Sequence, residues 1–307
     1  MTKPRIAPAV GILVTIAMLV VTAVTGSGQA QTTYKAARTQ DGQPDLQGVW
    51  QAVNTAVWNI QDHPPALGIP AGQGIVEGNE IPYLPLALAR RQENYRNRFT
   101  DDPESKCFMV GTPRVNYMPH PLEIVQTANQ VTILYEYVHT SRHIYLNSKH
   151  PEGKIQWFMG DSRGRWDGDS LVVDVIHFTD QNWLDRSGNY HSDDMHLVER
   201  WTRTSADHLW YEATIEDPSV FARPFKMRFP LYRRIEPNIQ LLEYECHTYL
   251  ELEKERRAGV TPGDRRTRFA RMLKNPSRGP YITEGERMVQ SRPLALTSSI
   301  AFAFELA

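Results

Sequence analysis

The chain has 307 residues and nearly balanced charge, with 34 Lys and Arg residues against 35 Asp and Glu residues. This length is enough for one large domain or for a domain with long arms. Because phosphate binding needs clustered Lys and Arg and no basic stripe stands out, the composition argues against a nucleic-acid partner.

Residues 1–30 have the layout of a secretory signal segment. Lys3 and Arg5 precede an apolar run from Ile6 to about Val24, and small and polar residues follow up to Ala30. We expect cleavage after Ala30, which predicts a periplasmic or secreted protein. The alternative is an uncleaved anchor, because a run of roughly 20 apolar residues is long enough to span a bilayer. Membrane contact is expected only through this segment, if it is not removed.

The next part, residues 31–106, is predicted to be an N-terminal arm with one helix. Its first half is rich in Gly, Pro, Gln and Asn and shows little periodicity, which is typical of irregular structure. Residues 84–99 bring strong helix formers directly after two prolines, which predicts a helix of three to four turns.

Residues 107–250 are predicted to form the main domain, a mainly β structure. Short runs rich in Val, Ile, Tyr, Trp and Thr alternate with turn residues, and an Asp-Gly turn at 167–168 precedes an apolar run. The close spacing of these strand-like runs favours an antiparallel meander that closes into a lipocalin-like β-barrel. The expected strands are 122–127, 130–138, 142–146, 155–159, 170–178, 195–203, 208–216, 226–234 and 238–249. Residues 251–307 are predicted to be a partly helical C-terminal extension.

The two cysteines, Cys107 and Cys246, both follow the predicted signal segment. In an oxidising compartment such a pair forms a disulfide, whereas the alternative is two buried thiols that never meet. We favour the disulfide.

Histidines are concentrated between residues 120 and 208, and the HSDDMH run places His191 and His196 around two aspartates. Because histidine titrates near neutral pH, general acid/base chemistry is the leading hypothesis. In it, His191 and His196 move protons, Asp185 and Glu199 orient them, and Arg200 or Arg142 stabilises developing negative charge.

A second set of residues is predicted to bind the substrate. Aromatic side chains cluster in the same third of the chain, and a barrel too wide to fill has an apolar cavity. The predicted binding residues are Arg142, Trp166, Trp183, Tyr135, Tyr211 and His150.

Several other site types are disfavoured by the sequence. It has no GxSxG elbow and no SxxK motif. No cofactor is predicted, and no metal site is assigned. A metal-dependent enzyme that uses His150, His191 and His196 with nearby aspartates remains an alternative.

A set of motifs spans roughly residues 44–248. It comprises PDLQGVW at 44–50, Asp102-Pro103, Cys107, GTPR at 111–114, GRWDGDSLVVD at 164–174, WLD at 183–185, His191-Ser192 and LVER at 197–200. With these motifs the chain resembles a broad group of uncharacterised exported bacterial proteins. The resemblance supports the domain boundaries and the choice of site residues, and it implies no activity.

The function hypotheses are therefore three. The first is an exported barrel enzyme that acts on a small, largely apolar organic molecule by acid/base chemistry, as an isomerase, cyclase, lyase or hydratase. The second is a non-catalytic periplasmic binding or carrier barrel, and the third is the metal-dependent enzyme. The sequence gives no oligomeric state.

Overall fold

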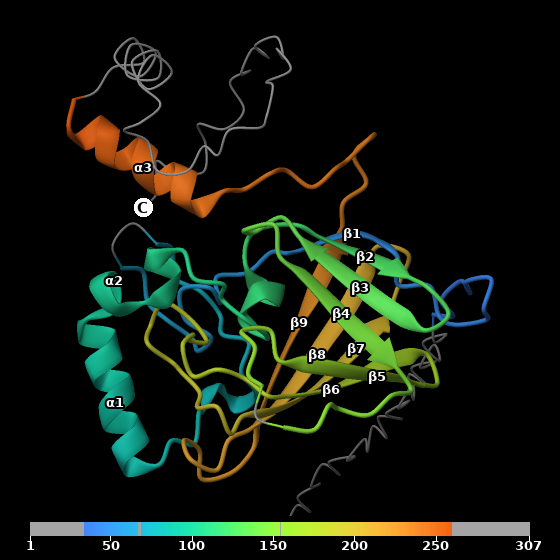
Figure 1. The fold of residues 1–307 in the computed structure, drawn as a ribbon, viewed down its shortest axis with the longest axis horizontal. Helices are drawn as coiled ribbons and strands as arrows, with labels where there is room; N and C mark the ends of the chain where they lie inside the picture. The colour runs from blue at the N-terminus through green and yellow to red at the C-terminus, as the bar shows by residue number, and fades with distance from the viewer. Residues whose placement is uncertain (1–33, 67–68, 154, 260–307) are drawn as a thin grey trace, which may run out of the picture. The chain divides into compact units, whose positions relative to one another are not determined.

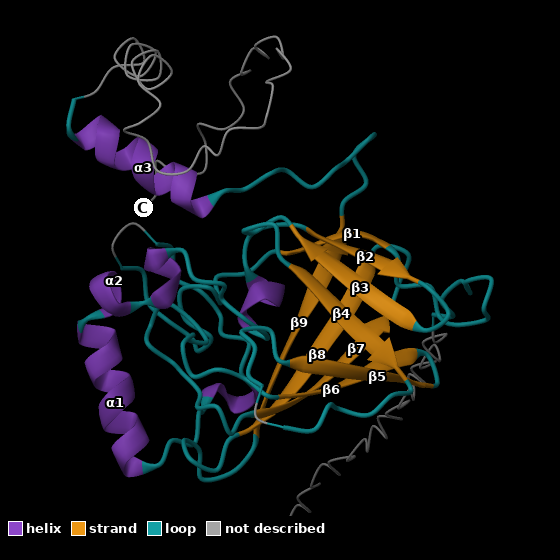
Figure 2. Ribbon diagram, in the orientation of Figure 1, coloured by secondary structure: helices purple, strands orange, loops and turns teal. Residues whose placement is uncertain are grey.

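The computed structural model describes residues 34–66, 69–153 and 155–259. The predicted signal segment lies outside these ranges, as does the predicted C-terminal extension beyond residue 259. Figures 1 and 2 show the described part as a barrel of strands, with α1 and α2 to one side and loops between them and the barrel.

Nine strands of the described ranges form a closed barrel in sequence order, which confirms the predicted fold class. Closure comes from β1, which pairs with both β2 and β9. The strands are β1 (Gly48–Ala52), β2 (Leu122–Gln126), β3 (Gln130–Tyr135), β4 (Ser141–Leu146), β5 (Asp161–Asp167), β6 (Ser170–Ile176), β7 (His196–Arg203), β8 (His208–Glu216) and β9 (Phe225–Arg233).

One strand pair departs from the expected antiparallel meander. β4 and β5 pair in parallel, with Ile144 opposite Ser162, whereas all other neighbours in the barrel are antiparallel. The connection between them therefore crosses from one end of the barrel to the other instead of turning back as a hairpin.

Two predicted strands are replaced by two others. The segment 155–159 contributes only a single bridge at Trp157, and 238–249 has no strand and leads into a helix. The missed strands are β1, inside the predicted arm, and β5. The buried positions of β5 are the small residues Ser162 and Gly164, and a Cβ at Gly164 would lie 2.7 Å from the Ile144 side chain. A strand with such small buried residues carries no apolar alternation to detect.

Buried and partly exposed side chains alternate along several strands, and the buried ones fill the barrel interior. β7 and β8 both alternate buried and partly exposed residues, as a strand with one face in a core should. Trp201 and Tyr211 pack with their ring centres 4.7 Å apart, and Tyr211 lies 4.9 Å from Phe229. Because these rings are fully buried, this part of the interior is packed core.

The helices lie outside the barrel. α1 (Pro85–Arg96) begins with proline at its first turn and confirms the predicted helix, and the short α2 (Arg98–Asp101) follows it. Short 3-10 helices span Glu77–Asn79, Pro103–Lys106 and Arg114–Tyr117, and α3 spans Cys246–Arg257. Among the described residues, no helix has the length and apolar character that a membrane span requires.

The predicted disulfide is present. Cys107 and Cys246 are bonded with their Cα atoms 5.6 Å apart, which joins the end of the second 3-10 helix to the first residue of α3. This bond closes a separation of 139 residues and indicates a non-reducing environment.

Candidate functional site

The barrel interior holds a buried ion pair between two of the predicted site residues. Arg142 of β4 donates to both carboxylate oxygens of Glu199 on β7, at 3.0 and 2.6 Å. Tyr211 and Asn116 also donate to Glu199, at 2.8 and 3.2 Å, and Tyr135 donates to Asn116. The structure thus brings together Arg142, Glu199, Tyr135 and Tyr211.

The Glu199 carboxylate keeps the buried Arg142 guanidinium charged. Burial lowers the pKa of Arg142, but the adjacent Glu199 carboxylate outweighs it and raises the pKa above its ordinary value. Burial and the same carboxylate raise the pKa of Tyr211, which therefore stays a hydrogen-bond donor. Since Glu199 accepts four hydrogen bonds and is fully buried, the cluster can act as a polar core of the barrel.

Asp185 organises the loop between β6 and β7. Its carboxylate accepts from the backbone N–H groups of Ile60, Ser187 and Asn189 at 2.8 to 3.1 Å, and from the Asn189 side chain at 2.6 Å. Burial raises the pKa of Asp185, and the donors from Asn189 and Ile60 oppose that rise. No histidine is among its hydrogen-bond partners, so the structure pairs it with backbone.

The two predicted proton-transfer histidines occupy different environments. His191 is 1% exposed, lies 5.6 Å from the Phe178 ring and has Nδ1 2.8 Å from the Ser192 carbonyl oxygen. Burial lowers the pKa of His191. His196 is partly exposed, with Nε2 2.9 Å from Asp174. The structure does not join either histidine to Asp185 or Glu199, and their proposed roles stay predictions.

The remaining predicted site residues are dispersed. Arg200 pairs with Asp167 at 2.6 Å among exposed side chains, and His150 pairs with Asp161 at 2.6 Å. Trp166 packs against the core from a partly exposed position, and Trp183 is buried. Within the described ranges, no three His, Cys, Asp or Glu side chains are arranged to hold a metal ion.

A pocket of about 720 Å³ lies among segments that sequence reasoning did not assign to a site. Its walls come from the N-terminal arm, α1 and α2, the β3–β4 turn, the β6–β7 loop and the start of α3. Aromatic side chains dominate these walls, namely Trp58, Tyr95, Phe99, Tyr137 and Tyr244. A concave, mostly apolar site with a few polar groups is the usual form of a small-molecule site.

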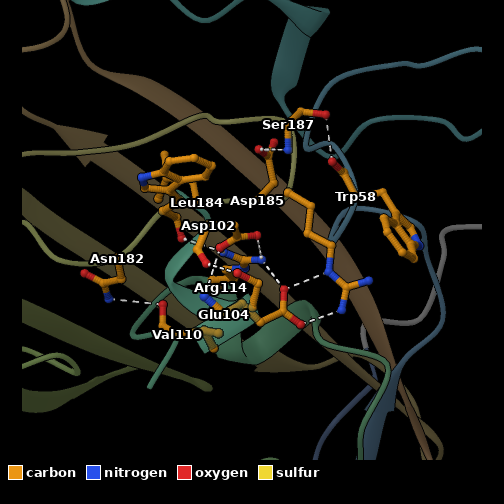
Figure 3. A network of polar contacts seen from close by, with 12 residues as sticks. Trp58, Asp102, Glu104, Val110, Arg114, Asn182, Leu184, Asp185 and Ser187 are labelled. Atoms are coloured by element: carbon orange, nitrogen blue, oxygen red, sulfur yellow. Dashed lines mark hydrogen bonds and ion pairs between the residues drawn. The ribbon is translucent and has the colours of Figure 1, made fainter. Parts of the chain in front are cut away.

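The polar part of the pocket is a buried charge cluster, part of which Figure 3 shows. Arg114, 1% exposed, donates to both oxygens of Asp102 at 3.1 Å and also to Glu104. Asp102 caps the second 3-10 helix by accepting from the Glu104 N–H at 3.0 Å. Burial raises the pKa of Glu104, but Arg114 and Arg186 outweigh it and lower the pKa, so that Glu104 is ionised.

Arg186 connects this cluster to the aromatic wall. Its Nε and Nη2 atoms donate to the two oxygens of Glu104, and its guanidinium lies 4.0 Å from the centre of the Trp58 ring. Ser187 fixes the same wall by donating to the Trp58 carbonyl oxygen at 2.8 Å. The loop that carries Arg186 approaches α1 so closely that a Cβ at Gly188, where φ is +81°, would lie 2.7 Å from Asn94.

A histidine outside the pocket lining packs against two tyrosines that line the pocket. The ring of His120 lies 4.6 Å from that of Tyr244 and 5.5 Å from that of Tyr137, which stack on each other at 5.3 Å. His120 Nδ1 lies 3.3 Å from Glu136, whose other oxygen accepts from the Leu242 N–H at 2.9 Å. Burial lowers the pKa of His120, although Glu136 opposes this shift.

None of these residues has a predicted role, and Glu104, Arg186 and His120 belong to none of the motifs. Asp102 and Arg114 stand in the quoted motifs around Cys107, and Arg186 directly follows the WLD motif. The signal that would have found them is an acidic pair before Cys107 together with one arginine in the GTPR motif and one directly after the WLD motif. Neither the known family models nor the curated proteins give a match to this chain.

Proposed function

We propose that this protein binds a small, largely apolar organic molecule in the aromatic pocket. The observation that carries the proposal is the pocket of about 720 Å³ whose aromatic walls end at the Glu104–Arg186 pair. The packed barrel interior is the scaffold in this proposal, and the loops and α1 beside it form the site. Rigid strands holding a site made of loops are a common arrangement in binding proteins and enzymes.

The proposed setting is the periplasm or the extracellular space. The Cys107–Cys246 disulfide supports an oxidising compartment, because cytosolic reductants keep most thiols reduced. The residues of the predicted signal segment lie outside the described ranges, so this support comes from the disulfide alone.

The test uses N-phenyl-1-naphthylamine, a neutral aromatic probe whose fluorescence rises in apolar sites. The wild-type protein is expected to bind it with a saturable, one-site curve. Replacing Trp58 by Leu removes a wall and should weaken binding about tenfold, which corresponds to about 1.4 kcal/mol. Absence of saturable binding by the wild-type protein would overturn the proposal.

A matched control distinguishes the pocket from any apolar surface. Trp157 is a partly exposed tryptophan that does not line the pocket. Trp157→Leu should therefore leave the probe affinity unchanged. Equal loss in the two variants would place the probe elsewhere.

A second candidate is acid/base turnover of the bound molecule. It is favoured by the His120–Glu136 pair, since a carboxylate beside Nδ1 orients a histidine for proton transfer and its ring contacts two pocket tyrosines. The test is deuterium exchange into the methyl group of 2-acetylnaphthalene in D2O, followed by NMR. Exchange that is faster than the solvent rate and is lost in His120→Gln supports turnover. Exchange at the solvent rate would mean that the protein binds the molecule without turning it over.

A further inference from the structure

Two hydrogen-bond donors of the pocket lack acceptors among the residues that the structure describes. The contacts of Arg186 with Glu104 use Nε and Nη2, and Nη1 makes no hydrogen bond to any described residue. Tyr137 is 3% exposed and lines the pocket, yet its hydroxyl also lacks a partner among the described residues. The Arg186 side chain is 35% exposed, and neither atom is enclosed away from solvent, so both are accessible from the pocket and can donate to an external acceptor.

Both donors stay protonated and line the same pocket. Burial raises the pKa of Tyr137, and the Glu104 carboxylate raises it further, while Arg114 and Arg186 oppose the rise. The tyrosine therefore remains a neutral donor at physiological pH. Tyr137 and Arg186 both line this pocket, and the Tyr137 ring stacks on Tyr244, another lining residue.

The charge balance around the two donors selects the type of acceptor. Three carboxylates line the pocket, those of Asp62, Asp102 and Glu104, against the two guanidinium groups of Arg98 and Arg186. Arg114, behind Asp102 and Glu104, brings the balance to zero. A ligand carboxylate would add an unmatched negative charge beside Glu104, whereas a neutral carbonyl oxygen accepts the same hydrogen bonds without one.

From this geometry we infer that the pocket recognises a neutral aromatic or alicyclic molecule through a carbonyl oxygen, which accepts from the Tyr137 hydroxyl and from Arg186 Nη1. This inference rests on the proposed binding function and names its ligand class. The stacked rings of Tyr137 and Tyr244 and the Trp58 ring contact the apolar body of the ligand.

The experiment measures displacement of N-phenyl-1-naphthylamine by three naphthalenes of similar shape. They are 2-acetylnaphthalene, with a neutral carbonyl, 2-ethylnaphthalene, with no acceptor, and 2-naphthoate, with a charged one. The acetyl compound should bind about tenfold more tightly than the ethyl compound, in line with one or two hydrogen bonds, and more tightly than the naphthoate.

Two variants then assign the preference to the two donors. Tyr137→Phe removes only the hydroxyl and keeps the ring stack, and Arg186→Met leaves Glu104 still paired with Arg114. Each should reduce the preference for the acetyl compound to about threefold or less while the probe itself still binds. Tyr145→Phe, on an exposed tyrosine outside the pocket, should retain the full preference.

The outcomes separate the two proposals. A wild-type protein that binds the probe but holds the acetyl and ethyl compounds equally would overturn the carbonyl inference alone. So would retention of the full preference in both variants, or tightest binding of the naphthoate. Failure of the wild-type protein to bind the probe and all three naphthalenes would overturn the binding function itself.

Discussion

The guanidinium of Arg186 lies 4.0 Å from the centre of the Trp58 ring while two of its nitrogens donate to Glu104. This contact joins the aromatic wall of the pocket to its buried charges. Because Arg186 is held on two sides, its remaining nitrogen is oriented before any ligand arrives, and preorganised donors lose less entropy on binding.

Replacing Glu104 by Gln should destabilise the fold strongly. The variant leaves Arg114, which is 1% exposed, with Asp102 as its only carboxylate partner among the described residues, and it removes the ion pair of Arg186. Breaking a buried ion pair costs about 3 to 5 kcal/mol. Urea unfolding measures the loss, and Asp167→Asn, at an exposed ion pair, is the control expected to show no measurable change. Equal stabilities of the two variants would contradict this role of Glu104.

The Glu199–Arg142 pair offers a test of whether the barrel interior is structural. Glu199→Gln should lower the free energy of unfolding by about 3 to 5 kcal/mol, because Arg142 stays buried without its counter-charge. The double variant with Arg142→Met and Glu199→Leu should recover much of that loss, since no buried charge remains. A double variant as unstable as the single one would argue against the ion-pair explanation.

Reduction of the disulfide should loosen one wall of the pocket. Cys246 starts α3, and Tyr244 just before it lines the pocket. The variant with both cysteines replaced by serine should lose about 2 to 4 kcal/mol in urea unfolding and bind N-phenyl-1-naphthylamine more weakly. Hydrogen exchange in residues 242–250 should rise in the same variant. Unchanged exchange and affinity would show that Glu136 and the tyrosine stack hold this segment without the disulfide.

Acidification should destabilise the protein through its buried histidines. Burial lowers the pKa of both His191 and His120 in the folded state, so below about pH 6.5 the unfolded chain binds more protons than the folded one. Stability is therefore expected to fall as the pH drops from 7 to 5. His191→Gln should flatten this dependence in urea unfolding, whereas Trp157→Leu, which removes no titratable group, should leave it unchanged. The same slope in wild type and His191→Gln would remove His191 as a cause.

Seven of the nine strands are predictable because they are short runs rich in β-branched and aromatic residues, some with clear alternation, as in β7 and β8. Sequence reasoning missed β5 because small residues fill the buried side of that strand. It also named Arg142, Glu199, Tyr135 and Tyr211 as site residues; their side chains meet inside the barrel, and their roles in binding or catalysis stay predictions.

The pocket was beyond sequence reasoning for a physical reason. Trp58, Phe99, Tyr137, Arg186 and Tyr244 come from five separate segments, and most of these lie in loops whose path depends on tertiary contacts. The alternation of side chains along a strand predicts which strand residues face the core, but it does not predict where loop residues lie. By contrast, the disulfide was predictable because the chain has only two cysteines.

Photo-crosslinking with benzophenone, followed by peptide mapping, shows directly where an aromatic carbonyl compound binds. Benzophenone is neutral, aromatic and carries a carbonyl group, so it combines the features expected of the ligand. Adducts are expected in the segments that contain Trp58, Tyr95, Phe99, Tyr137 and Tyr244, and they should be lost when 2-acetylnaphthalene competes. Adducts confined to other segments, such as the outer faces of β5 to β7, would contradict binding in this pocket.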